Sequence, residues 1–237
     1  MKKFFILLAA SFFLVAFAPK ETSTTEAGIE VKAPSLIAEH VSIGKLYYNL
    51  YDNKTAEVDN YDNSLSGKLT IPSTINYKSE KYSVTKIGFL AFRECSNLTS
   101  VTIPNSVTCI GDGAFKDCFR LASVTIPNSV TSIGDGIFNG CMRLTSPMYV
   151  NHIFAYFPQS YQGAYAIPKG ITQIAGYAFA GCENLTSVTI PNSVTSIGDK
   201  AFAWCSSLIS VTIPNSVTNI ADNAFKECKN LNIIYEE

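Results

Sequence analysis

The amino-acid sequence predicts a β-rich, right-handed solenoid of six coils of about 23 residues, and three observations predict it. The phrase VTIPNSVT recurs almost unchanged, apolar residues return at the same places after each copy, and one cysteine per copy keeps the spacing. A constant period of about 20–29 residues is typical of a chain whose short coils stack on one another. The phrase starts at Val101, Val124, Val188 and Val211. The cysteines are Cys95, Cys118, Cys141, Cys182, Cys205 and Cys228.

Each coil is predicted to begin with a short strand that faces the core through alternate residues. In the copy that starts at Leu121, Val124 and Ile126 point inward, while the intervening Ser and Thr point outward. This spacing matches the L-x-x-L-x-L pattern of leucine-rich repeats. Pro127 ends the strand because its nitrogen cannot donate a hydrogen bond to a neighbouring strand. We therefore expect short parallel strands, one per coil, stacked on one another.

The second half of each coil is predicted to return through a short 3₁₀ or helical turn. Gly134 opens this turn, Phe138 lies within it, and Cys141 ends it before Leu144 starts the next coil. An aspartate occupies one turn position in several copies, and we expect it to cap the helical segment. A row of calcium sites is the functional alternative for these carboxylates. The aspartates are Asp112, Asp135, Asp199 and Asp222.

Residues 1–18 have the composition of a secretory signal peptide, with Lys2 and Lys3 before an apolar run. An uncleaved N-terminal anchor is the alternative for this segment. Residues 19–43 are expected to be a linker. Residues 44–66 predict an N-terminal β-hairpin, with its turn at residues 52–54, which would cap the open end of the solenoid core.

Two places break the period. The leucine-rich repeats of residues 67–146 contain an insertion at 76–83 in the first coil, which predicts a β-hairpin with its turn near Ser79 and Glu80. Residues 147–166 form a second, aromatic insertion. The repeats then continue over residues 167–237 to a C-terminal edge, where Glu236 is expected to take the place that Ile213 has one coil earlier.

The repeated coil resembles the BspA-like (Treponema-type) leucine-rich repeat family of surface proteins, whose hallmark is I-P-x-S-V-T-x-I-G-x-x-A-F-x-x-C-x-x-L. The resemblance covers residues 69–231, and the Tyr-rich hairpin upstream is similar to the family's N-terminal cap. It implies a secreted or surface-exposed protein of a host-associated microbe. It also implies adhesion to matrix proteins such as fibronectin and fibrinogen, or to other cells. The family offers no catalytic motif to transfer to this chain.

The repeated cysteines are predicted to form a ladder of buried, reduced thiols. Stacking places equivalent atoms of neighbouring coils about 4.8 Å apart. A disulfide needs Cβ atoms about 3.8 Å apart and a different relative orientation. Cys109 lies outside this ladder, at a position where other coils carry Ser132, Ser196 and Asn219, and is expected to be exposed.

Composition and motifs argue against catalysis and against several ligand classes. The net charge is −1, and the Lys and Arg residues are not clustered as a nucleic-acid surface requires. The two histidines, His40 and His152, are not paired with a nucleophile, and the cysteine spacing lacks the C-x-x-C pattern of zinc sites. We expect no enzyme activity, no metal, no cofactor, no nucleic-acid partner and no small-molecule substrate.

Residues that vary between otherwise identical coils are the candidate binding residues. Phe119, Arg120, Met142, Arg143 and Trp204 flank the repeated cysteines, where other coils carry Ser, Asn, Glu or Lys. Exposed aromatic residues with arginine are enriched at binding hot spots. The aromatic insertion adds a second set, which either binds a ligand or packs back on the solenoid, the interpretation that we favour. This set is Tyr149, Phe154, Tyr156, Phe157 and Tyr161.

The sequence therefore predicts a non-catalytic, extracellular or cell-surface, monomeric leucine-rich repeat protein that binds another protein, such as a host matrix protein. A carbohydrate-binding protein is one alternative, which would use the insertion and the outward rows of Ser and Thr on the strands. A purely structural or antigenic surface repeat is the other alternative.

Overall fold

The computed structural model describes residues 32–236, and contacts divide the chain into the units Met1–Pro34 and Ser35–Glu237. The predicted signal peptide lies outside the described residues, and so does most of the predicted linker. Within residues 32–236 the regular elements are nineteen strands, and these residues contain no helix. None of the described residues belongs to a helix long and apolar enough to cross a membrane.

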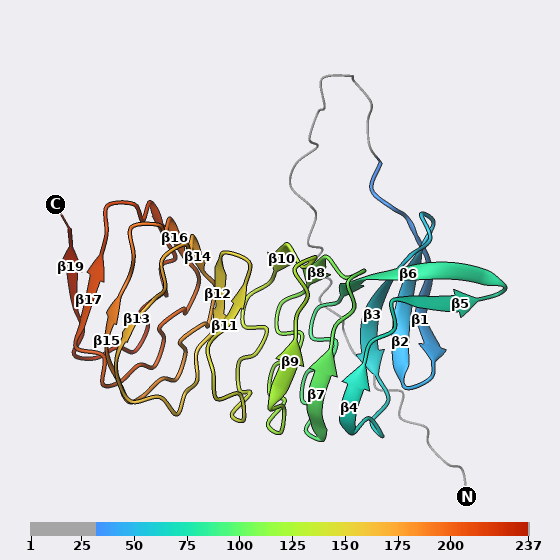
Figure 1. Cartoon of the computed structure of the whole chain (residues 1–237), viewed down its shortest axis with the longest axis horizontal. Helices are drawn as coiled ribbons and strands as arrows, with labels where there is room; N and C mark the ends of the chain where they lie inside the picture. The colour runs from blue at the N-terminus through green and yellow to red at the C-terminus, as the bar shows by residue number, and fades with distance from the viewer. Residues whose placement is uncertain (1–31, 237) are drawn as a thin grey trace, which may run out of the picture. The chain divides into compact units, whose positions relative to one another are not determined.

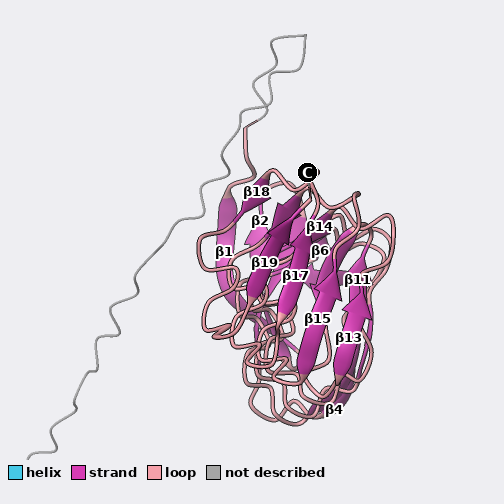
Figure 2. Ribbon diagram, turned by 90° about the vertical axis from the view of Figure 1, so that its left-hand side faces the viewer, coloured by secondary structure: helices cyan, strands magenta, loops and turns pink. Residues whose placement is uncertain are grey.

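The VTIP segments form parallel strands that stack from coil to coil (Figure 1). Equivalent residues pair, as in Val101 with Val124 and Thr102 with Thr125, which confirms the predicted register. Figure 2 shows the C-terminal set of these strands side by side. The first set is β4 (Gly67–Thr70), β7 (Leu98–Thr102) and β9 (Ser123–Thr125). The second set is β13 (Gly163–Ala166), β15 (Leu185–Thr189), β17 (Ser210–Ile213) and β19 (Asn232–Tyr235).

A second row of strands, most of them only two residues long, closes the opposite side of each coil. The pairing of Ile110 with Ile133 and of Ile174 with Ile197 keeps the repeat register here too. The first set of these strands is β6 (Glu80–Ile87), β8 (Cys109–Ile110) and β10 (Ser132–Ile133). The second is β12 (Ile153–Tyr156), β14 (Gln173–Ile174), β16 (Ser196–Ile197) and β18 (Asn219–Ile220).

The core between the two rows is organised around a column of phenylalanine rings. Phe92 and Phe115 stack with centroids 5.1 Å apart, and Phe179 and Phe202 stack at 4.8 Å. Because each coil contributes one ring at the same position, the column covers both faces of every internal layer. A single coil buries too little apolar surface to fold alone, and stacking supplies the remaining contacts.

The corner that follows the second strand is a chain of tight turns, and the predicted 3₁₀ or helical segment is wrong. Along the corner, every second N–H group donates to a carbonyl of the same turn, and the N–H groups between them donate to carbonyls of the next coil. Ala114, Lys116 and Cys118 donate to carbonyls three residues back, while Gly113, Phe115 and Asp117 donate to Asp135, Ile137 and Asn139. Gly113 and Asp117 have φ of 58° and 59°, and a helix needs negative φ at every residue. Half of the N–H groups that would bond within a helix therefore bond to the neighbouring coil instead.

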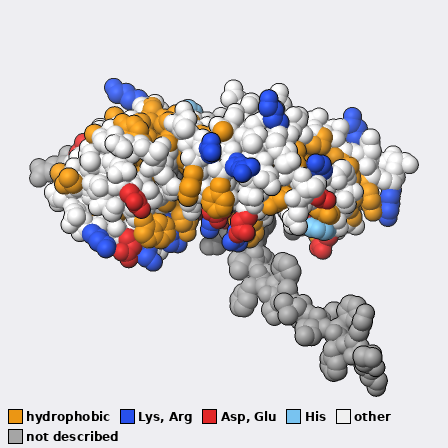
Figure 3. Space-filling model, turned by 90° about the horizontal axis from the view of Figure 1, so that it is seen from below, with side chains coloured by type: hydrophobic (Ala, Val, Ile, Leu, Met, Phe, Trp, Pro, Cys, Tyr) orange, Lys and Arg blue, Asp and Glu red, His pale blue; other side chains and the backbone are white. Residues whose placement is uncertain are grey.

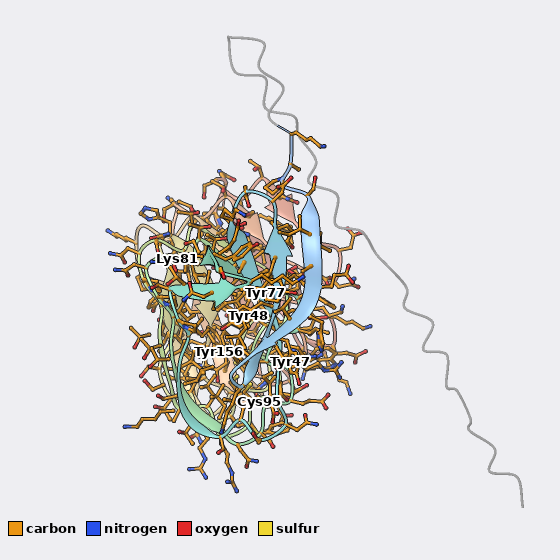
Figure 4. All side chains as sticks on the ribbon, turned by 90° about the vertical axis from the view of Figure 1, so that its right-hand side faces the viewer. Tyr47, Tyr48, Tyr77, Lys81, Cys95 and Tyr156 are labelled. Carbon is orange, nitrogen blue, oxygen red and sulfur yellow. The ribbon has the colours of Figure 1, made fainter. Side chains whose placement is uncertain are left out.

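An antiparallel sheet precedes the first coil. β2 (Leu46–Tyr51) and β3 (Thr55–Tyr61) form the predicted hairpin, and β3 pairs in parallel with β6 of the first coil. Figure 4 looks onto this end of the unit, where Tyr48 is buried. The expected linker of residues 19–43 is wrong in its last part, because residues 36–43 form the edge strand β1 (Leu36–Ile43). The side chains of β1 are mostly exposed, so its sequence lacks the alternation of apolar and polar residues that predicts a strand.

The hairpin predicted inside the first coil is present. β5 (Thr74–Tyr77) pairs with the start of β6, opposite Ser83 to Glu80. Its turn lies at Lys78 and Ser79, one residue earlier than predicted, and these residues have φ of 48° and 66°. Two successive positive φ values define the tight turn whose twist matches that of a hairpin.

The aromatic insertion builds an additional, shortened layer of the solenoid. β11 (Met148–Val150) turns back antiparallel onto β12, and β12 pairs onward with β14. The N–H of Phe157 donates to Ala178, as Phe115 donates to Ile137 in a regular coil. Both rows of strands are interrupted here, because β9 does not pair with β13 and β10 does not pair with β12.

The final strand is shifted by one residue from the expected alignment. Tyr235 lies opposite Ile213, and Glu236 instead donates its N–H to the Ile213 carbonyl. Ile233 consequently faces the core opposite Val211. The predicted place of Glu236 is therefore wrong by one position.

Candidate interaction surface

Phe119 and Met142 lie at equivalent exposed corners of two adjacent repeats. Each follows its cysteine in the same turn, in which Phe119 donates its N–H to Asp117 and Met142 donates to Gly140. Their side chains are large, apolar and 44% and 65% exposed. Equivalent positions of stacked strands lie about 4.8 Å apart, so the two side chains form one apolar patch.

Arg120 and Arg143 follow these residues and are both exposed. Each arginine is one residue further along the same turn, so each cation lies beside the apolar patch. We call Phe119, Arg120, Met142 and Arg143 the cysteine-corner patch. Figure 3 views the molecule from below and shows hydrophobic side chains interspersed with Lys, Arg, Asp and Glu. An apolar centre bordered by arginines is the composition of a protein-binding hot spot.

Trp204 lies at the cysteine corner of a later repeat and has a left-handed backbone. Its φ is 59°, and its side chain is 44% exposed. Two other coils have glycine here, Gly140 and Gly181, with φ of 79° and 74°. Glu94, Asp117 and Glu227 have the same left-handed conformation in the remaining coils, so the backbone belongs to the repeat and the indole side chain is what distinguishes Trp204. Local packing does not require an exposed indole at this place.

Most of the aromatic insertion is buried. Phe154 and Phe157 lie 4.6 and 4.7 Å from the ring of Phe179, and Tyr156 donates its hydroxyl to the carbonyl of Cys141. Tyr161 is half-buried and donates to Ala164 at 2.8 Å. Tyr149 remains 38% exposed. Of the predicted residues in the insertion, only Tyr149 therefore offers a large surface to a partner.

The repeated cysteines lie in a column behind the phenylalanine rings, and all seven cysteines are free thiols. Each of four thiols hydrogen-bonds a phenylalanine carbonyl of the preceding repeat, at 3.0–3.1 Å. Burial raises the pKa of Cys95 to about 11. A hydrogen bond with Cys182 raises the pKa of Cys205 to about 12. Thiols held in their neutral form are poor nucleophiles and poor metal ligands, so this column is structural.

The repeated aspartates bridge coils, and the expected helix caps are wrong because the described residues contain no helix for them to cap. Asp112 accepts the N–H of Asp135 at 2.9 Å, and Asp135 accepts the N–H of Gly176 at 2.8 Å. Desolvation raises the pKa of the Asp135 carboxyl, and the charges of Asp112 and Asp199 add to the effect. Among residues 32–236, no three His, Cys, Asp or Glu side chains are placed to hold a metal ion.

Two aromatic residues outside the predicted set, one exposed and one half-buried, lie at a different corner. Phe89 is 67% exposed and occupies the aspartate position of the first coil, while Tyr177 occupies a position where Gly113 and Gly136 lie in other coils. Both residues line a cavity of about 300 Å³. Comparing the copies at these two positions would have revealed both departures.

A family model described as the BspA type leucine rich repeat region matches residues 68–155 and 151–236, with six copies. No curated protein matches the sequence significantly. The solved structures that are similar to the chain include the following three. A leucine-rich repeat protein from Bacteroides ovatus is 32% identical, with a TM-score of 0.58, over 83% of this chain and 53% of that one. The chain thus spans about half the length of that protein.

The T. pallidum leucine rich repeat protein is 29% identical, with a TM-score of 0.52, over 83% of this chain and 82% of that one. A leucine rich cell surface protein from Faecalibacterium prausnitzii is 21% identical, with a TM-score of 0.32, over 87% and 96% of the two chains. The first two structures share the stacked-coil fold described above.

Proposed function

Because the chain belongs to the BspA-type leucine-rich repeat family, we propose that it is a non-catalytic surface protein that binds another protein, in adhesion to host matrix or to other cells. The repeat family is a scaffold, so binding specificity lies in the residues that differ between coils. The apolar run after Lys2 and Lys3 supports export from the cytoplasm.

The observation that carries this proposal is the cysteine-corner patch together with Trp204. Phe119, Met142 and Trp204 are exposed at the same corner of the coil, although the repeat has small or polar residues at these positions elsewhere. A rigid scaffold holds them, so little conformational entropy is lost on binding. Arg120 and Arg143 add cations that can pair with carboxylates of a protein partner.

Surface plasmon resonance on immobilised fibronectin and fibrinogen tests the proposal. The variant combines Phe119→Ser, Met142→Ser and Trp204→Gly, which restore residues that other coils carry at these positions. We expect saturable binding by the natural chain and a loss of at least about 30-fold in the variant, the equivalent of one strong hot spot.

The matched control is Ser132→Asn, which introduces the residue found at Asn219 on a different side of the coil. It should bind like the natural chain. Equal binding by the triple variant and the natural chain would exclude this patch. Binding to neither protein would remove matrix adhesion as the function.

A further inference from the structure

We infer that the groove between Phe89 and Tyr177 is a binding site for a short, uncharged oligosaccharide. This groove lies at the aspartate corner of the coil and is separate from the cysteine-corner patch. Its cavity, of about 300 Å³, crosses four successive repeats. The lining residues are Phe89, Leu90, Arg93, Asp112, Gly113, Lys116, Asp135, Gly136, Asn139 and Tyr177.

The two aromatic rings stand at opposite ends of the groove. Phe89 belongs to the first repeat and Tyr177 to the fourth, and the Tyr177 ring extends back over Gly136 of the third repeat. Gly136 donates its N–H directly to Gly176, so three coil spacings separate the backbones of Phe89 and Tyr177. At about 4.8 Å per spacing, this distance is about 14 Å. Phe89 is 67% exposed and Tyr177 is half-buried, and the accessible parts of such aromatic rings provide apolar contact for the flat C–H face of a sugar ring. The separation suits a short oligosaccharide that contacts one ring at each end.

The Tyr177 ring is held in place before any ligand arrives. Lys200 donates to the Tyr177 hydroxyl at 2.9 Å, and its Nζ lies 5.1 Å from the ring centroid. Asp199 fixes that lysine through a 3.0 Å ion pair. The ring lies against Gly136, where an added Cβ would be 3.4 Å from the ring carbon Cδ2. A ring fixed in this way loses little freedom on binding.

The floor between the rings consists of two glycines, with the Leu90 side chain next to Gly113 and the Tyr177 ring next to Gly136, and it offers no free backbone donors. Gly113 and Gly136 form it, with φ of 58° and 61°. Their N–H groups bond to Asp135 and Gly176 of the following repeats. Arg93, Lys116 and Asn139 donate their N–H groups within their own turns, and Leu90 and Tyr177 donate theirs to Asp112 and Asp199 of the following repeats. An extended peptide is recognised chiefly through such backbone groups, so the groove does not favour a peptide.

The side walls offer both donors and acceptors and carry no net charge. Arg93, Lys116 and Asn139 can donate, while Asp112 and Asp135 can accept. In the described residues each aspartate uses its Oδ1 atom for a backbone N–H, which leaves Oδ2 for a ligand. Among the lining residues two cations and two carboxylates cancel, and Arg93 is also paired with Glu94 at 2.8 Å, so the groove offers no excess of positive charge to an anionic molecule. Neighbouring hydroxyl groups, which both donate and accept, match these walls.

Isothermal titration calorimetry of the chain with neutral oligosaccharides tests this inference, with trisaccharides of glucose, galactose, mannose and N-acetylglucosamine as probes. The variants are Phe89→Asp and Tyr177→Gly, which restore the residues of other repeats at these positions. Glycine also suits the positive φ of 61° at Tyr177, so this variant should fold. We expect at least one probe to bind, and each variant to bind it about tenfold more weakly.

The control Phe119→Ser lies in the cysteine-corner patch and should leave oligosaccharide binding unchanged. Binding of a neutral probe should also vary little between low and high salt. Three results would overturn the inference: no neutral probe binds, both variants bind as well as the natural chain, or only anionic oligosaccharides bind. Since matrix binding is tested with a different set of variants, the two proposals can fail separately.

Discussion

The thiol of Cys118 donates a hydrogen bond to the carbonyl oxygen of Phe92, one repeat earlier, with 3.0 Å between Sγ and O. The same contact joins Cys141 to Phe115 and Cys205 to Phe179. Each cysteine therefore links its own layer to the previous one at the position where the phenylalanine rings stack. This contact explains why a cysteine recurs in a chain whose cysteines are all free.

We predict that Cys118→Ala destabilises the chain and that Cys109→Ser does not. The first change removes the hydrogen bond to Phe92 and leaves a small cavity, which together cost about 2 kcal/mol. Cys109 is only half-buried, and Ser132 pairs beside it at the same position of the next coil. Urea denaturation should place the Cys109 variant within about 0.5 kcal/mol of the natural chain. Similar losses in both variants would contradict a structural role specific to the column.

We predict that alkaline pH destabilises the fold from about pH 9 upward. Burial raises the pKa of Cys95 to about 11, from an ordinary value of 9.0. The native state therefore holds its thiol proton where the unfolded state has released it. Stability from this thiol is complete below the unfolded pKa and falls as the pH rises toward the folded one, by up to about 1.4 kcal/mol per pH unit. Chemical denaturation at pH 8, 9 and 10 measures the effect, and Cys95→Ala should show a shallower decline.

We predict that Trp204→Gly is more stable than Trp204→Ala by about 1 kcal/mol. Both variants lose the indole, but only alanine retains a Cβ in the left-handed conformation, which costs about 1–2 kcal/mol. The conformational entropy of glycine offsets part of that gain. Thermal and urea denaturation of the two proteins provide the comparison. An alanine variant as stable as the glycine variant would mean that the backbone relaxes and that no strain is stored there.

We predict that Gly134→Ala costs at least about 2 kcal/mol, because a Cβ there would lie 2.0 Å from Oδ1 and 2.4 Å from the backbone nitrogen of Asp112. The fourth repeat already carries Ala175 at this position, next to the shortened layer, and Ala175→Gly serves as the matched reverse change. It should cost no more than about 1 kcal/mol. Equilibrium urea unfolding measures both, and a mild effect of Gly134→Ala would show that adjacent coils can separate locally.

The stacked strands could be predicted because every copy of the repeat has apolar residues at the same inward positions and Ser or Thr at the same outward positions. The conformation of the corner could not be predicted from one repeat. The N–H of Phe115 bonds to the carbonyl of Ile137, which belongs to the neighbouring coil. The edge strand that includes Leu36 was missed because it has little buried surface. In the insertion, the spacing from Phe157 to Phe179 is close to one period. This spacing indicates that Phe157 takes the place of a repeat phenylalanine in the core.

The candidate surfaces were predictable only in part. Phe119, Met142 and Trp204 could be found because each departs from the repeat beside a cysteine, and the structure places them on the surface. Phe89 and Tyr177 depart from the repeat equally clearly. They line one cavity only because stacking aligns corners from different coils, which requires the three-dimensional arrangement.

The interruption of both strand rows after the third repeat has a consequence for cooperativity. Across this seam Gly136 donates its N–H to Gly176, and side chains such as Asn151 and Tyr156 supply further bonds. Elsewhere continuous ladders join each layer to the next. We therefore expect the chain to contain two foldons that meet at residues 145–157. In native-state hydrogen exchange, amides on either side of this boundary should exchange with two different opening free energies, and a single value throughout would contradict this division.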